Sequence, residues 1–152
     1  MTIEPVNTDK ETAQLNMMKI IWLGLLFYSG VLVYVAFKVL TPREFVESPL
    51  ETPFLIVAVG ILIAGRMIPK LLNRNFKSIQ KLNDNVKTLQ AYLVGFIIAL
   101  SLSESVVMLG FVLVIVTGNP KRILPFALAG IINILMLYPR KDVILGTFDR
   151  IT

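Results

Sequence analysis

The sequence predicts an all-α integral membrane protein with four transmembrane helices, both termini in the cytoplasm, and one amphipathic cytoplasmic helix. The mean hydropathy is +0.74 and 55% of the 152 residues are apolar, which is more hydrophobic than an ordinary soluble domain. These apolar residues gather in four long runs, and most charged residues lie between the runs. We therefore expect a multi-pass protein embedded in a lipid bilayer.

The amino-terminal part is expected to form a cytoplasmic segment, residues 1–17, followed by the first transmembrane hairpin, residues 18–72. The first span covers residues 18–40, and no small-residue cleavage site follows it, so we expect an anchor rather than a cleaved signal peptide. The second span begins near Thr52. Arg66 marks its inner end, where a long basic side chain can extend to the lipid headgroups.

Residues 73–90 are expected to form a basic amphipathic cytoplasmic helix, because apolar residues recur there at helical spacing with lysines between them. Two placements remain open. The helix lies on the inner leaflet with its lysines toward anionic lipid headgroups, or it continues into the third span and packs its apolar stripe on a partner. The residues of this membrane-surface or partner helix are Phe76, Lys77, Ile79, Lys81, Leu82, Val86, Lys87 and Leu89.

The second transmembrane hairpin occupies residues 91–139, and a cytoplasmic tail, residues 140–152, follows it. Gly118, Asn119 and Pro120 separate its two spans. Glycine suits the left-handed conformation after a helix, asparagine caps a helix start, and proline fits a first helical turn. These residues predict a tight turn between two antiparallel helices.

The distribution of basic residues predicts the orientation. With four spans, the termini and the middle loop share one side, and most of the 15 basic residues fall there. The opposite side has Lys38, Arg43, Lys121 and Arg122. The positive-inside rule then places both termini in the cytoplasm, and we expect a multi-pass protein of the cell membrane, of the bacterial cytoplasmic type.

The composition argues against several function classes. The absence of cysteine and histidine removes thiolate chemistry, disulfides, and the usual zinc and haem ligands. Phosphate-binding loops and nucleophile elbows are absent from the sequence. Because most basic residues flank apolar spans, topology explains them better than nucleic-acid binding does. We expect no enzyme, catalytic residue, metal or cofactor, and no nucleic-acid partner.

Glu104 is the one residue that points directly to a functional site. It lies at the midpoint of the apolar run from residue 91 to 117, which contains no other carboxylate or basic side chain. A charged carboxylate at mid-membrane costs about 2.5–3.5 kcal/mol, so we expect the neutral acid. Ser101 and Ser105 are near it along the helix and can donate hydrogen bonds to it.

Asn133 is the expected partner of Glu104. The two residues are equally far from the turn, so antiparallel helices place them at one depth. Asn133 is also the strongly polar side chain of the fourth span. We predict that its amide faces the Glu104 carboxyl, within one chain or across a subunit contact.

Three roles remain open for Glu104: a structural contact, a proton or cation site, and a contact with a ligand or lipid headgroup. We expect a non-enzymatic small polytopic subunit of a larger or self-associated membrane complex, with other membrane subunits or copies of itself as partners. The alternative is a proton- or cation-translocating or -sensing subunit with Glu104 as the ion-binding carboxylate.

Residues 100–115 contain a membrane-embedded Glu104, a small residue directly after it, and Gly110 before an aliphatic run. In these features the segment resembles the ion-carrying helix of rotary ATPase c subunits. The resemblance implies that Glu104 is the matching ion-binding carboxylate, and it carries over no other residue.

Overall fold

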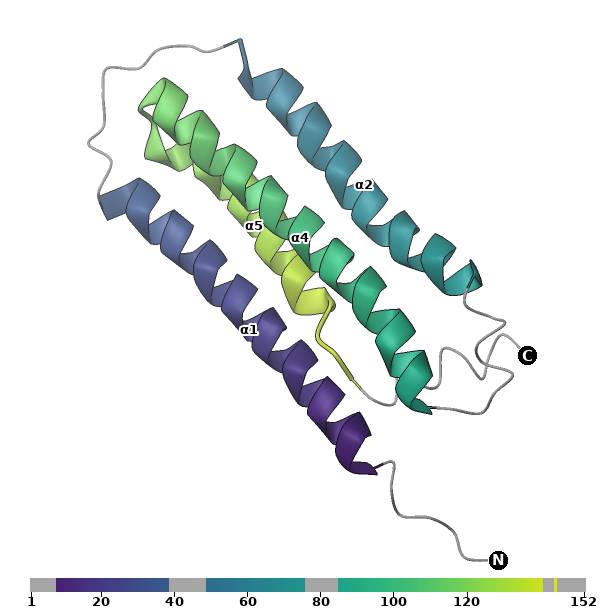
Figure 1. Cartoon of the computed structure of the whole chain (residues 1–152). Coiled ribbons are helices and arrows are strands. Elements are labelled where there is room, and N and C mark those ends of the chain that lie inside the picture. The colour runs from purple at the N-terminus through teal and green to yellow at the C-terminus, as the bar shows by residue number, and fades with distance from the viewer. Residues whose placement is uncertain (1–7, 39–48, 76–84, 141–143, 145–152) are drawn as a thin grey trace, which may run out of the picture.

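The computed structural model describes residues 8–38, 49–75, 85–140 and 144, and every regular element in these ranges is helical. Figure 1 shows long helices running side by side in one bundle. The elements are α1 (Thr8–Lys38), α2 (Glu51–Asn75), α4 (Asn85–Thr117), the short 3-10 helix η1 (Pro120–Arg122) and α5 (Ile123–Met136).

Helix α4 is the centre of the bundle. It packs against α1, α2 and α5, whereas α2 has few contacts with α5. In Figure 1, α1 and α2 lie on opposite sides of the pair formed by α4 and α5. Leu100 belongs to a buried cluster with residues of α1 and α5, and Val107 belongs to a second cluster with residues of the same two helices. Val106 belongs to a third cluster, with residues of α2 and α5. The buried core therefore follows the length of α4.

Three helices are long and apolar enough to cross a membrane: α1, α2 and α4. The predicted fourth span is also helical, but α5 has 14 residues, a length of about 21 Å against a hydrocarbon core of about 30 Å. It is short because η1 precedes it and because the chain leaves the α-helix at Leu137, before Pro139. The structure thus shows three membrane-spanning candidates and a shorter helix packed beside the central one.

The tight turn between α4 and α5 is confirmed. Gly118 has a φ of 69°, and its N–H donates to the carbonyl of Val114 at 2.7 Å, which is a left-handed helix end. The side chain of Asn119 accepts from the N–H of Lys121, and Pro120 takes the first position of η1. The difference from the prediction is that one 3-10 turn precedes the α-helix.

The predicted amphipathic helix falls largely outside the described residues. Phe76, Lys77, Ile79, Lys81 and Leu82 lie outside the described ranges, as do the side chains of Val86 and Lys87. Within these ranges, residues 73–75 belong to α2 and residues 85–90 begin α4. Leu89 is fully buried in a cluster that includes Met18 and Ile144, so this position packs inside the chain.

Two glycines allow α4 and α5 to approach closely. A Cβ atom added to Gly130 would lie 2.8 Å from the carbonyl oxygen of Ser103, and one added to Gly110 would lie 2.6 Å from the Cβ of Phe126. Backbone and Cβ atoms cannot move aside as a flexible side chain can. Contact between these helices at this distance therefore requires glycine at both positions.

We predict that Gly130→Ala destabilises the folded protein by about 1–3 kcal/mol, because the added methyl group must push α5 away from α4. Thermal unfolding in mild detergent, followed by circular dichroism, measures the change. Gly60→Ala is the matched control, since no atom lies within 4 Å of its added Cβ. If both variants unfold at the wild-type temperature, the close packing at Gly130 does not contribute to stability.

Candidate functional site

Asn133 and Ser103 form a buried polar contact between α5 and α4. The Nδ2 of Asn133 donates to the Oγ of Ser103 at 2.7 Å, and the Ser103 hydroxyl donates to the carbonyl of Ala99 at 2.7 Å. Asn133 and Ser103 are only 6% and 1% exposed. Gly130, one turn before Asn133, lets α5 come close enough for this bond. The contact fixes the register of the two helices.

Within the described residues the Asn133 amide donates to Ser103, the residue before Glu104, and no hydrogen bond joins Asn133 to Glu104. The predicted depth of Asn133 along α4 differs from the observed depth by one residue. One residue corresponds to about 100° around a helix, so Ser103 points toward α5 and Glu104 points away from that contact. A contact between Glu104 and Asn133 across subunits stays a prediction.

Glu104 lies at the edge of the face of α4 that α1, α2 and α5 leave uncovered. Its side chain is half-buried, and Ser101 and Met108, one turn away on either side, are exposed. We call this face the outer stripe of α4; its residues follow one another at helical spacing. They are Ile97, Ser101, Glu104, Met108, Val112 and Ile115.

The two serines predicted to donate to Glu104 have different surroundings. The hydroxyl of Ser105 donates to the carbonyl of Ser101 at 2.8 Å, a bond within the helix. In the described part of the chain, the polar contacts of this region thus involve Ser103 and the helix backbone. Glu104 itself is a half-buried member of the outer stripe.

Two further polar contacts hold the outer helices to this core. The indole N–H of Trp22 donates to the carbonyl of Ile134 at 2.7 Å, and its ring meets Tyr138 edge-on with centroids 5.1 Å apart. At the other end, Arg122 and Glu51 form an ion pair at 3.4 Å. The first contact attaches α1 to the end of α5, and the second attaches the start of α2 to η1.

Sequence reasoning did not identify two of these features. Ser103 was not expected to be the partner of Asn133, although a small residue on the face of Gly110 is a signal of close helix packing. Arg66 was expected only to extend toward headgroups, whereas it reaches α5 and its Nη2 contacts the sulfur of Met136 at 3.7 Å. No local sequence pattern predicts that contact.

The described residues contain no group of three carboxylate, histidine or cysteine side chains that could hold a metal ion. Comparison of the chain with protein-family models, curated proteins and solved structures gives no match. The resemblance of residues 100–115 to rotary ATPase c subunits stays a prediction about Glu104.

We predict that Ser103→Ala and Asn133→Ala each destabilise the protein by about 1 kcal/mol and that their effects are not additive. The coupling energy should be about 0.6–1.7 kcal/mol, because either substitution already removes the same buried bond. A double-mutant cycle of thermal unfolding in one detergent measures it. The control cycle pairs Asn133→Ala with Ser105→Ala, whose hydroxyl bonds within its own helix. Equal coupling energies in both cycles would contradict a specific hydrogen bond between Asn133 and Ser103.

Proposed function

We propose that this protein is a non-enzymatic subunit of a larger or self-associated membrane complex, and that the outer stripe of α4 is its contact surface. The observation that carries the proposal is the position of Glu104. Its half-buried carboxyl lies on a stripe that includes exposed Met108 and Val112. Hydrocarbon solvates a carboxyl poorly, so a second protein surface that offers a hydrogen bond would stabilise this face.

The shape of the outer stripe supports the same proposal. Ser101 is small and exposed next to Glu104, so another helix can approach the carboxyl closely. Asn133, the amide predicted to meet Glu104, donates to Ser103 in its own chain. We therefore propose that the polar partner of Glu104 belongs to a neighbouring subunit, which is either a second copy or a different protein.

The second candidate function is proton or cation translocation or sensing, with Glu104 as the ion-binding carboxylate. The observation that favours it is that Glu104 is half-buried at the edge of the outer stripe, while the Asn133 amide is held by Ser103. A carboxyl at the boundary of a subunit contact can exchange a proton if that boundary admits water. This role requires the same assembly as the first.

Replacement of Glu104 tests both candidates. Glu104→Ala should reduce the mass of the detergent-extracted complex toward that of the 17.0 kDa chain, since it removes the polar contact. Glu104→Gln should retain assembly, because an amide still donates and accepts hydrogen bonds. Light scattering or native mass spectrometry in mild detergent measures the mass. Leu128→Ala, which alters an exposed residue of α5, is the control.

The outcomes separate the two candidates. A wild-type protein that is monomeric in mild detergent would contradict assembly. If Glu104→Gln retains the complex in vesicles but abolishes proton flux, the ion-carrying function is supported. If neither wild type nor Glu104→Gln shows flux while both remain assembled, the structural subunit is supported.

We further propose that the chain crosses a cell membrane four times with both termini in the cytoplasm. The positive-inside distribution supports this orientation, and η1 followed by α5 adds residues to the short fourth helix. Lys121 precedes α5 and exposed Arg140 follows it. A fourth crossing would place these two residues on opposite sides of the membrane.

We predict that Lys121→Cys reacts with an impermeant maleimide applied to the outside of intact cells, whereas Arg140→Cys reacts only after permeabilisation. The natural chain has no cysteine, so each variant reports one position. Asp9→Cys, near the start of α1, is the reference for the inner side. Labelling of Lys121→Cys and Arg140→Cys from the same side would show that α5 does not cross.

A further inference from the structure

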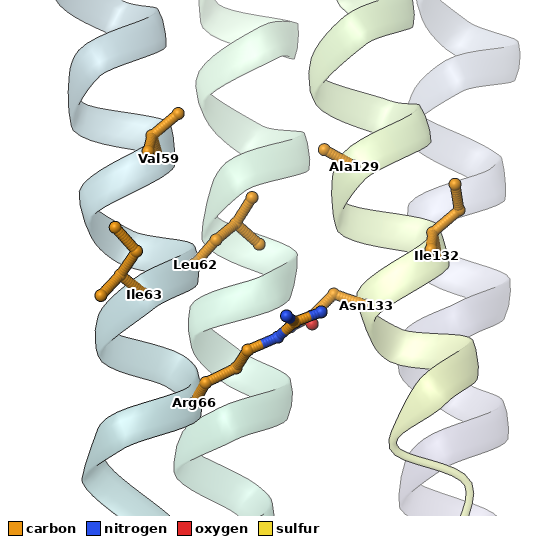
Figure 2. A pocket seen from close by; sticks show the side chains of 7 residues that line it. All are labelled: Val59, Leu62, Ile63, Arg66, Ala129, Ile132 and Asn133. Carbon is orange, nitrogen blue, oxygen red and sulfur yellow. The ribbon is translucent and has the colours of Figure 1, made fainter.

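A groove with a volume of about 220 Å³ lies between α2 and α5. Its apolar walls are Val59, Leu62 and Ile63 of α2, and Ala129 and Ile132 of α5. Figure 2 shows these side chains on the two helices, with α4 between and behind them. The helices have few direct contacts with each other, so the groove follows their separation along the side of α4.

Two polar side chains lie at one end of this apolar groove. Arg66 reaches across from α2 toward Asn133 of α5, as Figure 2 shows, and both residues line the groove. Arg66 is exposed, whereas Asn133 is buried and already donates to Ser103. The groove is thus apolar along its walls and positively charged at this end.

Among the described residues, the charge of Arg66 is poorly compensated. A guanidinium remains protonated in proteins, and Arg66 belongs to the apolar stretch of α2 that is long enough to span a membrane. Its contact in the described residues is the thioether of Met136 at 3.7 Å, and a thioether is a weak acceptor. Within the same ranges, no carboxylate forms an ion pair with Arg66; the pair described joins Arg122 and Glu51.

We propose that the groove binds one acyl chain of an anionic phospholipid and that Arg66 holds the phosphate of its headgroup. Guanidinium groups match phosphate oxygens with paired hydrogen bonds, and basic pockets between transmembrane helices bind anionic headgroups. The groove is smaller than the 300–1,000 Å³ that typically encloses a drug-sized ligand. It accommodates part of a single flexible hydrocarbon chain, the remainder of which stays in the bilayer.

The length of the groove agrees with this occupant. Val59 and Arg66 are seven residues apart on α2, which corresponds to about 10 Å along the helix axis. The apolar walls extend from Arg66 to Val59 in the amino-terminal half of α2, as an acyl chain extends from its headgroup. This binding site lies apart from the outer stripe of α4 and does not depend on the role of Glu104.

Native mass spectrometry of the full chain in equimolar phosphatidylglycerol and phosphatidylcholine, with identical acyl chains, tests the proposal. The wild type should retain phosphatidylglycerol in preference to phosphatidylcholine. Arg66→Gln should reduce the retained phosphatidylglycerol about tenfold, and Arg66→Lys should reduce it less, because it keeps the charge without the paired donors. Ala129→Phe, which fills the groove, should reduce retention of both lipids.

Arg140→Gln is the matched control, since it removes an equal charge from an exposed arginine that follows α5. It should retain phosphatidylglycerol as the wild type does. Equal losses in Arg66→Gln and Arg140→Gln would overturn the proposal in favour of general attraction by positive charge. Wild-type retention in Arg66→Gln or in Ala129→Phe would also overturn it. Arg66→Lys keeps the test valid if Arg66→Gln proves unstable.

Loss of lipid retention can be distinguished from loss of the proposed membrane complex. Variants of Arg66 should leave the mass of the protein complex unchanged, and variants of Glu104 should leave lipid retention unchanged. If Arg66→Gln instead dissociates the complex without changing lipid retention, the groove receives a protein segment and the lipid proposal is overturned.

Discussion

The contact between Gly130 and the backbone of Ser103 determines the arrangement of the other helices. It brings α5 so close to α4 that the amide of Asn133 reaches the hydroxyl of Ser103 at 2.7 Å. In a membrane, apolar side chains gain little by leaving lipid for protein, so close packing and buried hydrogen bonds provide much of the association. Here Gly130 provides the close packing and permits the buried hydrogen bond between Asn133 and Ser103.

The other helices depend on this pair. Once α4 and α5 are in register, the carbonyl of Ile134 is available to the indole of Trp22, and Arg122 is placed to meet Glu51. The pair also leaves Glu104 on the outer stripe of α4 and leaves a groove between α5 and α2. A shift of one residue in register would change the surroundings of both polar sites.

The sequence predicted the features that depend on local chemistry. Gly118 and Asn119 specify a turn through their own backbone and side-chain preferences, and the structure confirms both roles. The length of the apolar runs predicted the three spanning helices in the same way. The shorter helix α5 differs because its ends are defined by η1 and Leu137, which a count of apolar residues does not locate.

The rotation of each helix was harder to predict. Helix α4 is apolar on nearly all sides, so hydrophobic periodicity does not distinguish its packed face from its outer stripe. Counting from the turn gave the depth of Asn133 but could not distinguish Ser103 from Glu104. The direction of the Arg66 side chain could not be predicted either, because it depends on how α2 packs beside α5.

Trp22 is the single tryptophan of the chain, and its indole is bonded to the backbone of α5 while its ring contacts Tyr138. Separation of α1 from α5 would remove both interactions and expose the indole to a different solvent. The intrinsic fluorescence of the unmodified protein therefore reports on the docking of one particular helix. This optical signal could follow assembly, lipid exchange or unfolding without an added label.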